Sequence, residues 1–403
     1  MILSKKSIGL ILASVLIANT TGMGVFAYAP RYLLNLGVNV IVIQLILTFF
    51  ILTSVLFPPI IGKLSDKIQH RSMLFKFGAV GVSIIFFIFT TVFNLVLIII
   101  LMILYGFFGT FGRLKFVLFA ELVENDHRYI AYYAAITALG WFLGAFSTGI
   151  FVDIFGIDQY FLFLLMISLL NLVIIMFIKE NRGLILERHE KEKVENIDDV
   201  LLNNQNEMNQ ISRSIYPSLF LRNFGVRPIL VILAILMFFH LSSDTEIGFL
   251  IGINFLIQFF LNIILGHIIT EKNLKWIMII GYILSAITVF CWIFATDFWS
   301  FLLCQILISL SFAMFMTATQ IYVTKHTTPH NKGKYVGYMN TGSQLGSFSG
   351  GLMFSLLLVL YFGNYYPAMY FMIIFPAISA LIILIKFESE SVRYSSQKEK
   401  KIT

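Results

Sequence analysis

The chain has 403 residues, of which 59% are hydrophobic and 12% are charged, and its mean hydropathy is +0.89. A water-soluble protein carries about 25% charged residues, so this composition excludes a soluble globular protein and predicts a surface that mostly faces lipid. The net charge of +7 reflects basic residues that flank apolar segments, and it does not indicate a nucleic-acid partner.

Twelve apolar segments of about 20 residues, each long enough to cross the hydrocarbon core of a bilayer, follow one another along the chain. One hydrophilic segment, 179–226, separates them into two sets of six. The sequence therefore predicts an all-α membrane protein with an N-terminal six-helix bundle at 1–178, a C-terminal six-helix bundle at 227–386 and a tail at 387–403. The twelve predicted spans are 8–29, 39–61, 73–93, 95–119, 130–152, 159–178, 227–243, 246–269, 275–295, 298–323, 334–362 and 366–386.

The positions of the basic residues predict the orientation of these helices. If both termini are cytoplasmic, the inner loops and tails hold all 28 Lys and Arg residues except Arg31, Arg113 and Lys115, as the positive-inside rule requires. Residues 215–227, which include Arg222, are interpreted as an interfacial segment that leads into span seven. We expect a monomeric, multi-pass protein in the cell membrane of a prokaryote, with cytoplasmic termini.

Two turns at equivalent positions indicate an internal repeat. Gly62 opens the turn GKLSDKIQHR, and Gly266 opens its counterpart GHIITEKNLK 204 residues further along. In the first turn Asp66 can meet the positive end of a helix, and Lys67 and Arg71 can pair with acidic helix ends or lipid headgroups. We interpret Gly62, Asp66, Lys67 and Arg71 as a conformational latch in a protein whose solute site lies where the repeats meet.

Two glycine ladders repeat in the same way. Small residues four positions apart allow two membrane helices to approach closely, so these ladders predict helix packing, with a sliding hinge as the alternative. The ladders are Gly140, Gly144 and Gly149 in span five, and Gly342, Gly346, Gly350 and Gly351 in span eleven.

The turn at 62–74 resembles the signature loop of the major facilitator superfamily, Gly-x-Leu-x-Asp-Arg-x-Gly-Arg-Arg/Lys-x-x-Leu. At its key positions stand Gly62, Leu64, Asp66, Lys67, His70, Arg71 and Leu74, with Gln69 in place of the second glycine. The second ladder resembles the family motif Gly-x-x-x-Gly-Pro-x-x-Gly-Gly, with Ser347 in place of proline, and this motif favours exporters and antiporters. The resemblance covers 8–386. It implies the twelve-helix fold of that family and secondary transport of a small organic solute by rocking of two bundles.

Polar side chains inside apolar spans usually face a cavity or a partner. The candidates for contact with a solute are Asn19, Thr20, Arg113, His240, Asn254, Gln258, Gln305 and Ser309. Arg113 is a candidate contact for an anionic solute; alternatively its side chain reaches the membrane interface or pairs with Glu121 or Glu124. For Asn254 and Gln258 the alternative is hydrogen bonding between helices. The resemblance implies that spans one, four, seven and ten border the cavity.

Acidic residues are predicted only in loops, tails and span ends. A coupling proton would therefore use Asp244, Glu246 or His240, near the outer ends of spans seven and eight. The chain has no nucleotide-phosphate loop, no metal-ligand spacing and no nucleophile–base arrangement, so we expect neither an enzyme nor a bound cofactor. The alternative to a transporter is a non-transporting sensor or a lipid-handling protein on the same scaffold.

Overall fold

The structure is a computed structural model that describes residues 5–68, 70–92, 94–123, 127–178, 212–327 and 329–387. Within these ranges the secondary structure is helical and contains no strand. Twelve helices in the described ranges are long and apolar enough to cross a membrane, which matches the predicted number. Most of the predicted linker and all of the predicted tail beyond residue 387 lie outside the described residues.

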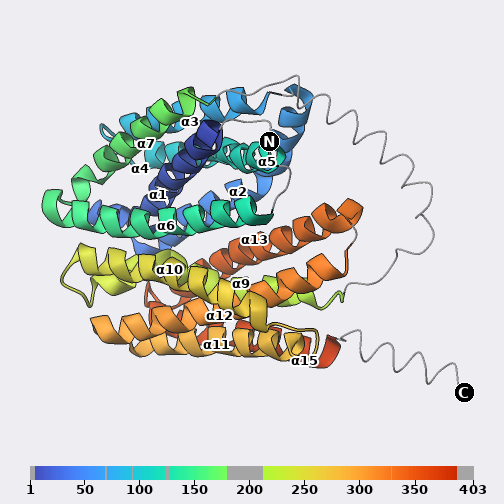
Figure 1. The fold of residues 1–403 in the computed structure, drawn as a ribbon. Helices are drawn as coiled ribbons and strands as arrows, with labels where there is room; N and C mark the ends of the chain where they lie inside the picture. Colours follow the sequence, from blue (N-terminus) through green and yellow to red (C-terminus); the bar gives the residue numbers. More distant parts are fainter. Residues whose placement is uncertain are drawn as a thin grey trace, which may run out of the picture. The chain divides into compact units, whose positions relative to one another are not determined.

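The first six spans occupy the chain up to residue 176 (Figure 1). Span four is interrupted by one turn of 3₁₀-helix, η1 (Phe111–Arg113), which joins α4 to α5. The helices are α1 (Lys5–Asn35), α2 (Val40–Ile68), α3 (Arg71–Phe89), α4 (Leu95–Thr110), α5 (Leu114–Leu122), α6 (His127–Phe155) and α7 (Tyr160–Met176), with a second 3₁₀ turn, η2 (Ile157–Gln159), before α7.

The other six spans follow from residue 215. Span twelve is divided between α14 and α15 because Pro376 has no N–H to bond the carbonyl of Met372. The helices are α9 (Ile215–Phe238), α10 (Asp244–Ile268), α11 (Leu274–Phe294), α12 (Phe298–Lys325), α13 (Pro329–Leu360), α14 (Tyr365–Met372) and α15 (Ile374–Lys386).

Span seven corrects the predicted start of the C-terminal bundle. The sequence places this start at 227, but α9 begins at Ile215. The arginines of this segment favour an interfacial interpretation, and Pro228 is typical of a first helical turn. In the structure Pro228 lies inside α9 and leaves the carbonyl of Phe224 without its helical partner. That carbonyl lies against Gly350 of α13.

The described residues form two compact units. Unit 1 comprises the described residues of 1–25, 53–144 and 159–210, and its core is built from α1, α2, α3, η1, α5 and α7. Aromatic stacking contributes to its packing, because the rings of Phe89 and Phe161 lie parallel with centroids 4.1 Å apart.

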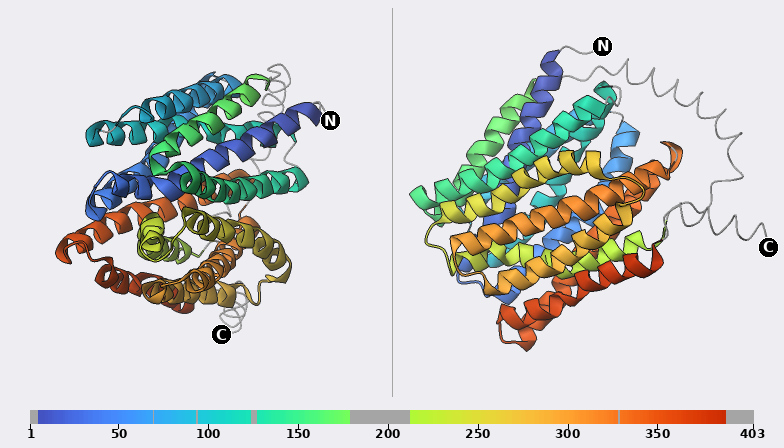
Figure 2. Two further views of the ribbon diagram at one scale, coloured as in Figure 1. Left: turned by 90° about the vertical axis from the view of Figure 1, so that its left-hand side faces the viewer. Right: turned by 60° about the horizontal axis from the view of Figure 1, so that its bottom comes forward.

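Unit 2 comprises the described residues of 26–52, 145–158 and 211–403. Helices α9 to α15 pack side by side in it (Figure 2), with α13 and α15 against α9 and with α11 between α12 and α15. The last part of α1, the first part of α2 and the last part of α6 also belong to this unit. Helices from both sequence repeats therefore pack together inside unit 2.

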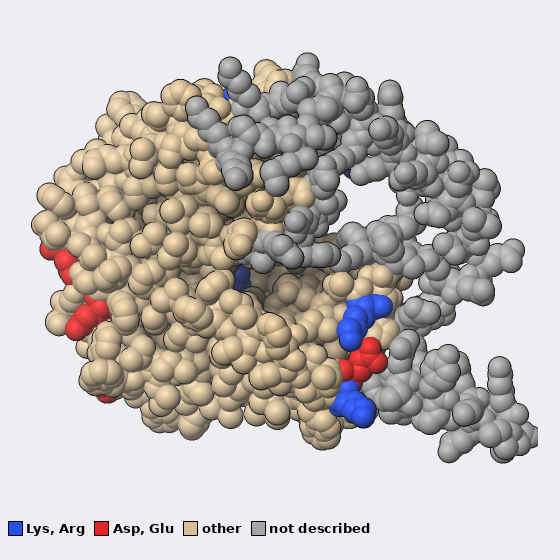
Figure 3. Space-filling view, viewed as in Figure 1, with Lys and Arg blue, Asp and Glu red and all other residues tan. Residues whose placement is uncertain are grey.

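The described acidic side chains of unit 2, and Lys325, lie at or near the ends of its helices. Asp297 caps the start of α12 and Lys325 lies in its last turn, while Asp244 begins α10. Figure 3 shows acidic side chains at the left-hand end of the visible face and a mixed group of basic and acidic side chains at its right-hand edge. The apolar lengths between these ends suit the hydrocarbon core of a bilayer.

Candidate functional site

The predicted polar stripe of span eight bonds to span ten. Ser309 Oγ on α12 lies 2.9 Å from Asn254 Oδ1 on α10, and Gln258 Nε2 donates to the same oxygen. Asn254 and Ser309 are buried, while Gln258 is partly exposed. Gln305 is fully buried, and both polar atoms of its side chain have no hydrogen-bond partner among the described residues. Asn254 and Ser309 thus form a hydrogen bond between α10 and α12. The side-chain amide of Gln305 is left free to bond to a group outside the described chain.

Asn19 and Thr20 are partly exposed on α1. Their side chains donate to backbone carbonyls of their own helix, Asn19 Nδ2 to Val15 O at 2.8 Å and Thr20 Oγ1 to Leu16 O at 3.0 Å. The backbone next to them lies against α6, because a Cβ added to Gly140 would stand 2.7 Å from Leu16 O. These residues line a close contact between α1 and α6 within unit 1.

The two basic residues of span four differ in their surroundings. Lys115 is 3% exposed, and its Nζ donates to Ser14 Oγ at 2.8 Å, while Ser14 Oγ donates to Asn171 Oδ1 at 2.8 Å. Arg113 is exposed at the end of η1 and makes no hydrogen bond or ion pair with the described part of the chain. Its alternative partners, Glu121 and Glu124, lie outside the described side chains.

His240 follows the end of α9. One ring nitrogen, Nε2, lies 3.3 Å from the hydroxyl of Tyr366 at the start of α14, and the ring is 6.1 Å from that of Phe301. This position beyond the last turn of span seven agrees with an interfacial hydrogen-bonding group. The structure does not bring His240 into contact with Asn254 or Ser309.

The predicted latch differs from its expected geometry. Gly62 does not open a turn, because α2 continues to Ile68, and nothing in the described chain lies within 4 Å of a Cβ added there. Gly62 therefore does not bring a helix end close to a neighbour. Lys67 is exposed, Arg71 begins α3, and the side chain of Asp66 lies outside the described ones.

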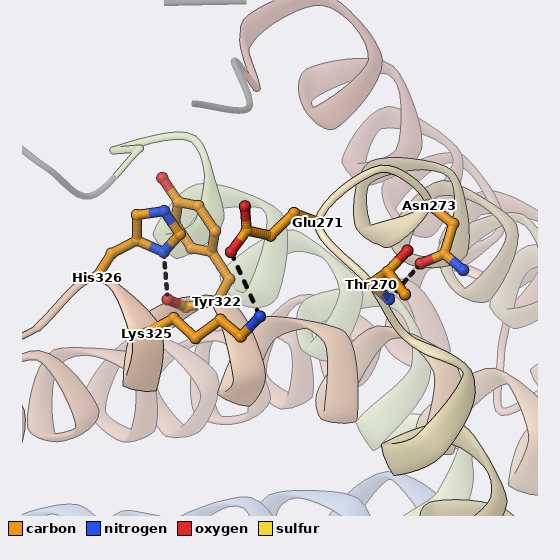
Figure 4. A network of polar contacts seen from close by, with 6 residues as sticks. All are labelled: Thr270, Glu271, Asn273, Tyr322, Lys325 and His326. Carbon is orange, nitrogen blue, oxygen red and sulfur yellow. Dashed lines mark hydrogen bonds and ion pairs between the residues drawn. The ribbon is translucent and has the colours of Figure 1, made fainter. Parts of the chain in front are cut away.

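The second copy of this turn is a polar cap at the ends of α10 and α12 (Figure 4). Gly266 lies in the last turns of α10, so it too is inside a helix. The carboxylate of Glu271 pairs with Lys325 Nζ at 3.3 Å, and the Thr270 N–H donates to Asn273 Oδ1 at 2.7 Å. Both members of the ion pair are exposed, so we expect it to stabilise the fold by about 1 kcal/mol or less.

The two glycine ladders form equivalent contacts in the two repeats. In the first, Gly144 of α6 lies against the backbone of α1, where an added Cβ would stand 2.9 Å from the Met23 Cβ. In the second, Gly346 of α13 lies against α9, where an added Cβ would stand 2.9 Å from the Phe220 carbonyl carbon. The last glycine of each ladder contacts the other repeat. Gly149 lies against α10, and Gly351 lies against α2.

Sequence reasoning missed a polar contact between α6 and α10. The Asp153 carboxylate, at the end of α6, accepts from Ser243 Oγ at 2.6 Å and from the N–H groups of Asp244 and Thr245 at 2.7 Å each. An anionic side chain of the first repeat thus caps the positive end of a helix of the second. Beside it the buried hydroxyl of Tyr28 donates to Asp244 O at 2.5 Å. We call Tyr28, Asp153, Ser243, Asp244 and Thr245 the crossing cap.

Two arginines inside span seven were also missed as intramembrane groups. Arg222 is 1% exposed; its Nε donates to Ser285 Oγ at 3.1 Å, and its guanidinium carbon lies 4.6 Å from the Phe315 ring centroid. Arg227 is partly exposed and lies 5.9 Å from the Phe26 ring centroid. The apolar helical pattern on both sides of these arginines was the signal that places them within the span.

The twelve candidate membrane spans of the described residues, arranged in two sets of six, define a polytopic membrane protein. A family model described as Major Facilitator Superfamily matches residues 10–241 and 208–402. The chain belongs to the Major Facilitator Superfamily.

The chain is 25% identical over 265 residues to an uncharacterized MFS-type transporter of Methanocaldococcus jannaschii, which covers 64% of this chain and 66% of that relative. The matched region thus spans just under two thirds of the relative's length.

Solved structures with the same fold include three transporters. The nucleoside transporter NupG has a TM-score of 0.73 at 12% identity and covers 96% of this chain and 100% of its own. A POT family transporter in complex with 5-aminolevulinic acid has a TM-score of 0.75 at 13% identity, with coverages of 94% and 95%. A D-xylose-proton symporter has a TM-score of 0.72 at 13% identity, with coverages of 95% and 97%. At these identities the likeness confirms the predicted fold alone.

Membership of the superfamily confirms the predicted family, which is a family of transporters rather than of enzymes. It also confirms an integral multi-pass membrane protein.

Proposed function

We propose that the chain carries a small organic solute by alternating access, and that the crossing cap opens and re-forms in each transport cycle. The observation that carries this proposal is that an α6 carboxylate caps an α10 helix of the other repeat. Hydrogen bonds to a charged carboxylate are stronger than neutral ones, but water can replace them when the helices separate. The cap is therefore a contact that can hold one state without preventing exchange to another.

The glycine contacts inside each repeat support the same proposal. Gly144 against α1 and Gly346 against α9 bring helix backbones together within a repeat, and such contacts pack two helices as one body. Rigid bundles that move as bodies around a shared site are the common arrangement of transporters built from repeats. The predicted latch of Gly62, Asp66, Lys67 and Arg71 remains part of this proposal, as the contact that would hold the opposite state.

The direction of transport, the orientation and the coupling belong to the proposal as well. The glycine motif of span eleven favours export, and the basic loops favour cytoplasmic termini in a prokaryotic cell membrane. Among the candidate contacts, Arg113 on span four and Gln305 on span ten have polar atoms that the described chain leaves without partners. Of the predicted site residues, these two are our first candidates for contact with a solute.

A cross-link across the crossing cap tests the proposal. The variant carries Asp153→Cys and Ser243→Cys in a background of Cys291→Ala and Cys304→Ala, because the two native thiols are free. Ser243 Oγ and Asp153 Oδ2 are 2.6 Å apart, so a short thiol reagent can join the introduced cysteines. We expect flux into proteoliposomes to fall at least tenfold on cross-linking and to return on reduction.

Two controls complete the cross-linking experiment. Each single-cysteine variant is treated with the same reagent, and its flux should be the same before and after treatment. The solute is one that raises the melting temperature of the purified protein in a thermal-shift screen, since a ligand of the folded state stabilises it. Unchanged flux in fully cross-linked protein would show that the cap need not open. Absence of flux for every stabilising solute in the untreated protein would favour the sensor or lipid-handling alternative.

A further inference from the structure

The strongest feature outside the contacts described so far is one stripe along α9. This helix is the most deeply enclosed of the twelve spans. Between residues 218 and 237 its residues are buried except for Leu221 and for one partly exposed line at helical spacing, formed by Phe220, Phe224, Arg227 and Leu230. Three members of the stripe are apolar, and the fourth is an arginine.

Arg227 lies near the middle of span seven. It is the thirteenth of the 24 residues of α9, so it stands about 18 Å from the first residue at the helical rise of about 1.5 Å per residue. It is partly exposed and makes no hydrogen bond or ion pair with the described chain. Its only specific contact among these residues is the ring of Phe26, whose centroid is 5.9 Å away.

Two other intramembrane cations bond to neighbouring side chains. Arg222 is fully buried and bonds through Nε to Ser285 Oγ at 3.1 Å and through Nη1 to Asn223 Oδ1 at 3.2 Å, while its Nη2 has no partner among the described residues. Lys115 is buried and bonds to Ser14 Oγ at 2.8 Å. Arg227 has no such partners, although it occupies the same depth range of an apolar span.

No carboxylate balances the charge of Arg227 within the described residues of unit 2. Every acid described there lies at or beyond a helix end, namely Asp153, Asp158, Asp244, Glu246, Glu271 and Asp297. An unpaired charge in the hydrocarbon region is costly and usually marks a functional group. Arg222 adds a second positive charge on the same helix, so the interior around α9 favours an anion.

We propose that Arg227 binds the anionic group of an organic solute, and that Phe26 and Phe224 contact the apolar body of that solute. A guanidinium presents a planar fork that matches the two oxygens of a carboxylate or a phosphate. Phe224 stands three residues before Arg227 on the partly exposed stripe, and Phe26 already faces the guanidinium. The inference rests on the proposed transport function and names the class of its substrate.

Matched pairs of acids and neutral analogues test this inference. The purified protein is assayed by thermal shift and by equilibrium binding against benzoate and benzamide, 4-phenylbutyrate and 4-phenylbutyramide, and phenyl phosphate and phenol. We expect wild-type protein to bind at least one acid at least tenfold more tightly than its neutral partner. The carboxylate and phosphate arms show which oxyanion the site prefers.

Three variants localise the effect. Arg227→Gln removes the charge and should abolish the tenfold preference, while Arg227→Lys keeps a charge without the planar fork and should retain part of it. Arg213→Gln is the matched control, because Arg213 is exposed before the start of α9 and its loss changes net charge equally. If no acid is preferred by the wild type, or if Arg227→Gln and Arg227→Lys both keep the full preference, the inference is overturned.

The outcome is separable from failure of the proposed function. Acid binding that depends on Arg227, without flux of any solute into proteoliposomes, would support the anion site and contradict transport. Flux of an acid and its neutral partner at equal rates, unchanged by Arg227→Gln, would support transport and contradict the anion site. The circular-dichroism helix content and gel-filtration profile of Arg227→Lys show that the comparison is made on folded protein.

Discussion

Two contacts built from the same glycine ladders have different chemistry. Inside the second repeat, Gly346 and Gly350 bring α13 against the backbone of α9, and the neighbouring groups are Phe220 for Gly346 and Phe224 for Gly350. Between the repeats, Gly149 brings α6 against α10, and the neighbouring groups are the Asp244 carbonyl and the Tyr28 hydroxyl. The first contact is backbone against backbone with aromatic surroundings, while the second is surrounded by hydrogen-bonding groups.

This difference separates permanent packing from packing that can be reversed. In a bilayer, helix association depends on close van der Waals contact and on bonds between helices, so an apolar glycine contact loses its stabilisation if the helices part. The groups of the crossing cap can bond to water instead, because Asp153 and Asp244 lie at helix ends. The comparison predicts that substitutions at Gly346 act on the fold, whereas substitutions at the cap act on the balance between states.

The largest effect is expected for Gly346→Ala. An added Cβ would lie 2.9 Å from both the carbonyl carbon and the Cα of Phe220, and backbone cannot move aside as a side chain can. Overpacking of this kind costs about 1–3 kcal/mol, and we expect the upper part of that range. Thermal unfolding in detergent should show a clear loss of melting temperature.

Gly266→Ala is the matched control for Gly346→Ala. Nothing lies within 4 Å of a Cβ added to Gly266, which is inside α10. Alanine is favoured over glycine in a helix by about 1 kcal/mol, so this variant should unfold at the same or a slightly higher temperature. Equal losses in both variants would remove the distinction between the ladder and an ordinary helical glycine.

A smaller effect on stability and a larger effect on conformation are expected for Gly149→Ala. Its Cβ would lie 2.5 Å from Asp244 O and 2.6 Å from the Tyr28 hydroxyl. Because the cap can open, the strain of about 1–3 kcal/mol should displace the state balance toward separated helices. A cysteine placed at Ser243 should then react faster with a membrane-impermeant maleimide, and an unchanged rate would mean that the contact is fixed.

Asp153→Asn tests the charge of the crossing cap. The amide keeps the size of the side chain but weakens three hydrogen bonds to Ser243, Asp244 and Thr245. Loss of a helix cap costs about 1 kcal/mol, so we expect a roughly fivefold shift of the state balance. The same maleimide assay measures it, with Asp158→Asn as the control because Asp158 bonds instead to Asn35 Nδ2.

The smallest effect is expected for Asp297→Asn, which changes a cap within one helix. Backbone bonding from Ser300 lowers the pKa of Asp297 below its ordinary value. A lowered folded-state pKa gives stability that is present above the unfolded pKa of about 3.9 and is lost as pH falls through the folded value. Wild type should therefore lose melting temperature below about pH 4 more steeply than Asp297→Asn, while maleimide reactivity at the crossing cap stays the same.

The sequence predicted the helices and both glycine ladders because these depend on local patterns. Apolar length marks a span, and small residues at spacing four mark a close approach. It placed the start of span seven twelve residues late, since residues 215–227, with Arg222 among them, are interpreted from the sequence as an interfacial segment. The partner that permits the burial of Arg222, Ser285 on α11, is 63 residues away.

The crossing cap could not be predicted from the sequence for the same reason, because its partners are far apart along the chain. Asp153 and Ser243 are 90 residues apart, and neither position carries a pattern that points to the other. The capping preference of Ser243 before α10 was readable locally, but the carboxylate that completes the cap was not. Arg227 was hidden by the misplaced boundary, because it stood at the first residue of the predicted span, where a basic residue can reach the membrane interface.

Counterflow in proteoliposomes tests most directly whether this chain is a carrier that alternates between two states. Vesicles are loaded with the unlabelled solute that most stabilises the purified protein, and uptake of the same labelled solute is measured against unloaded vesicles. A carrier whose site faces one side at a time should take up label severalfold faster in loaded vesicles, and cross-linking Asp153→Cys to Ser243→Cys should abolish this acceleration. Uptake that is independent of internal solute and rises linearly with external concentration would contradict alternating access.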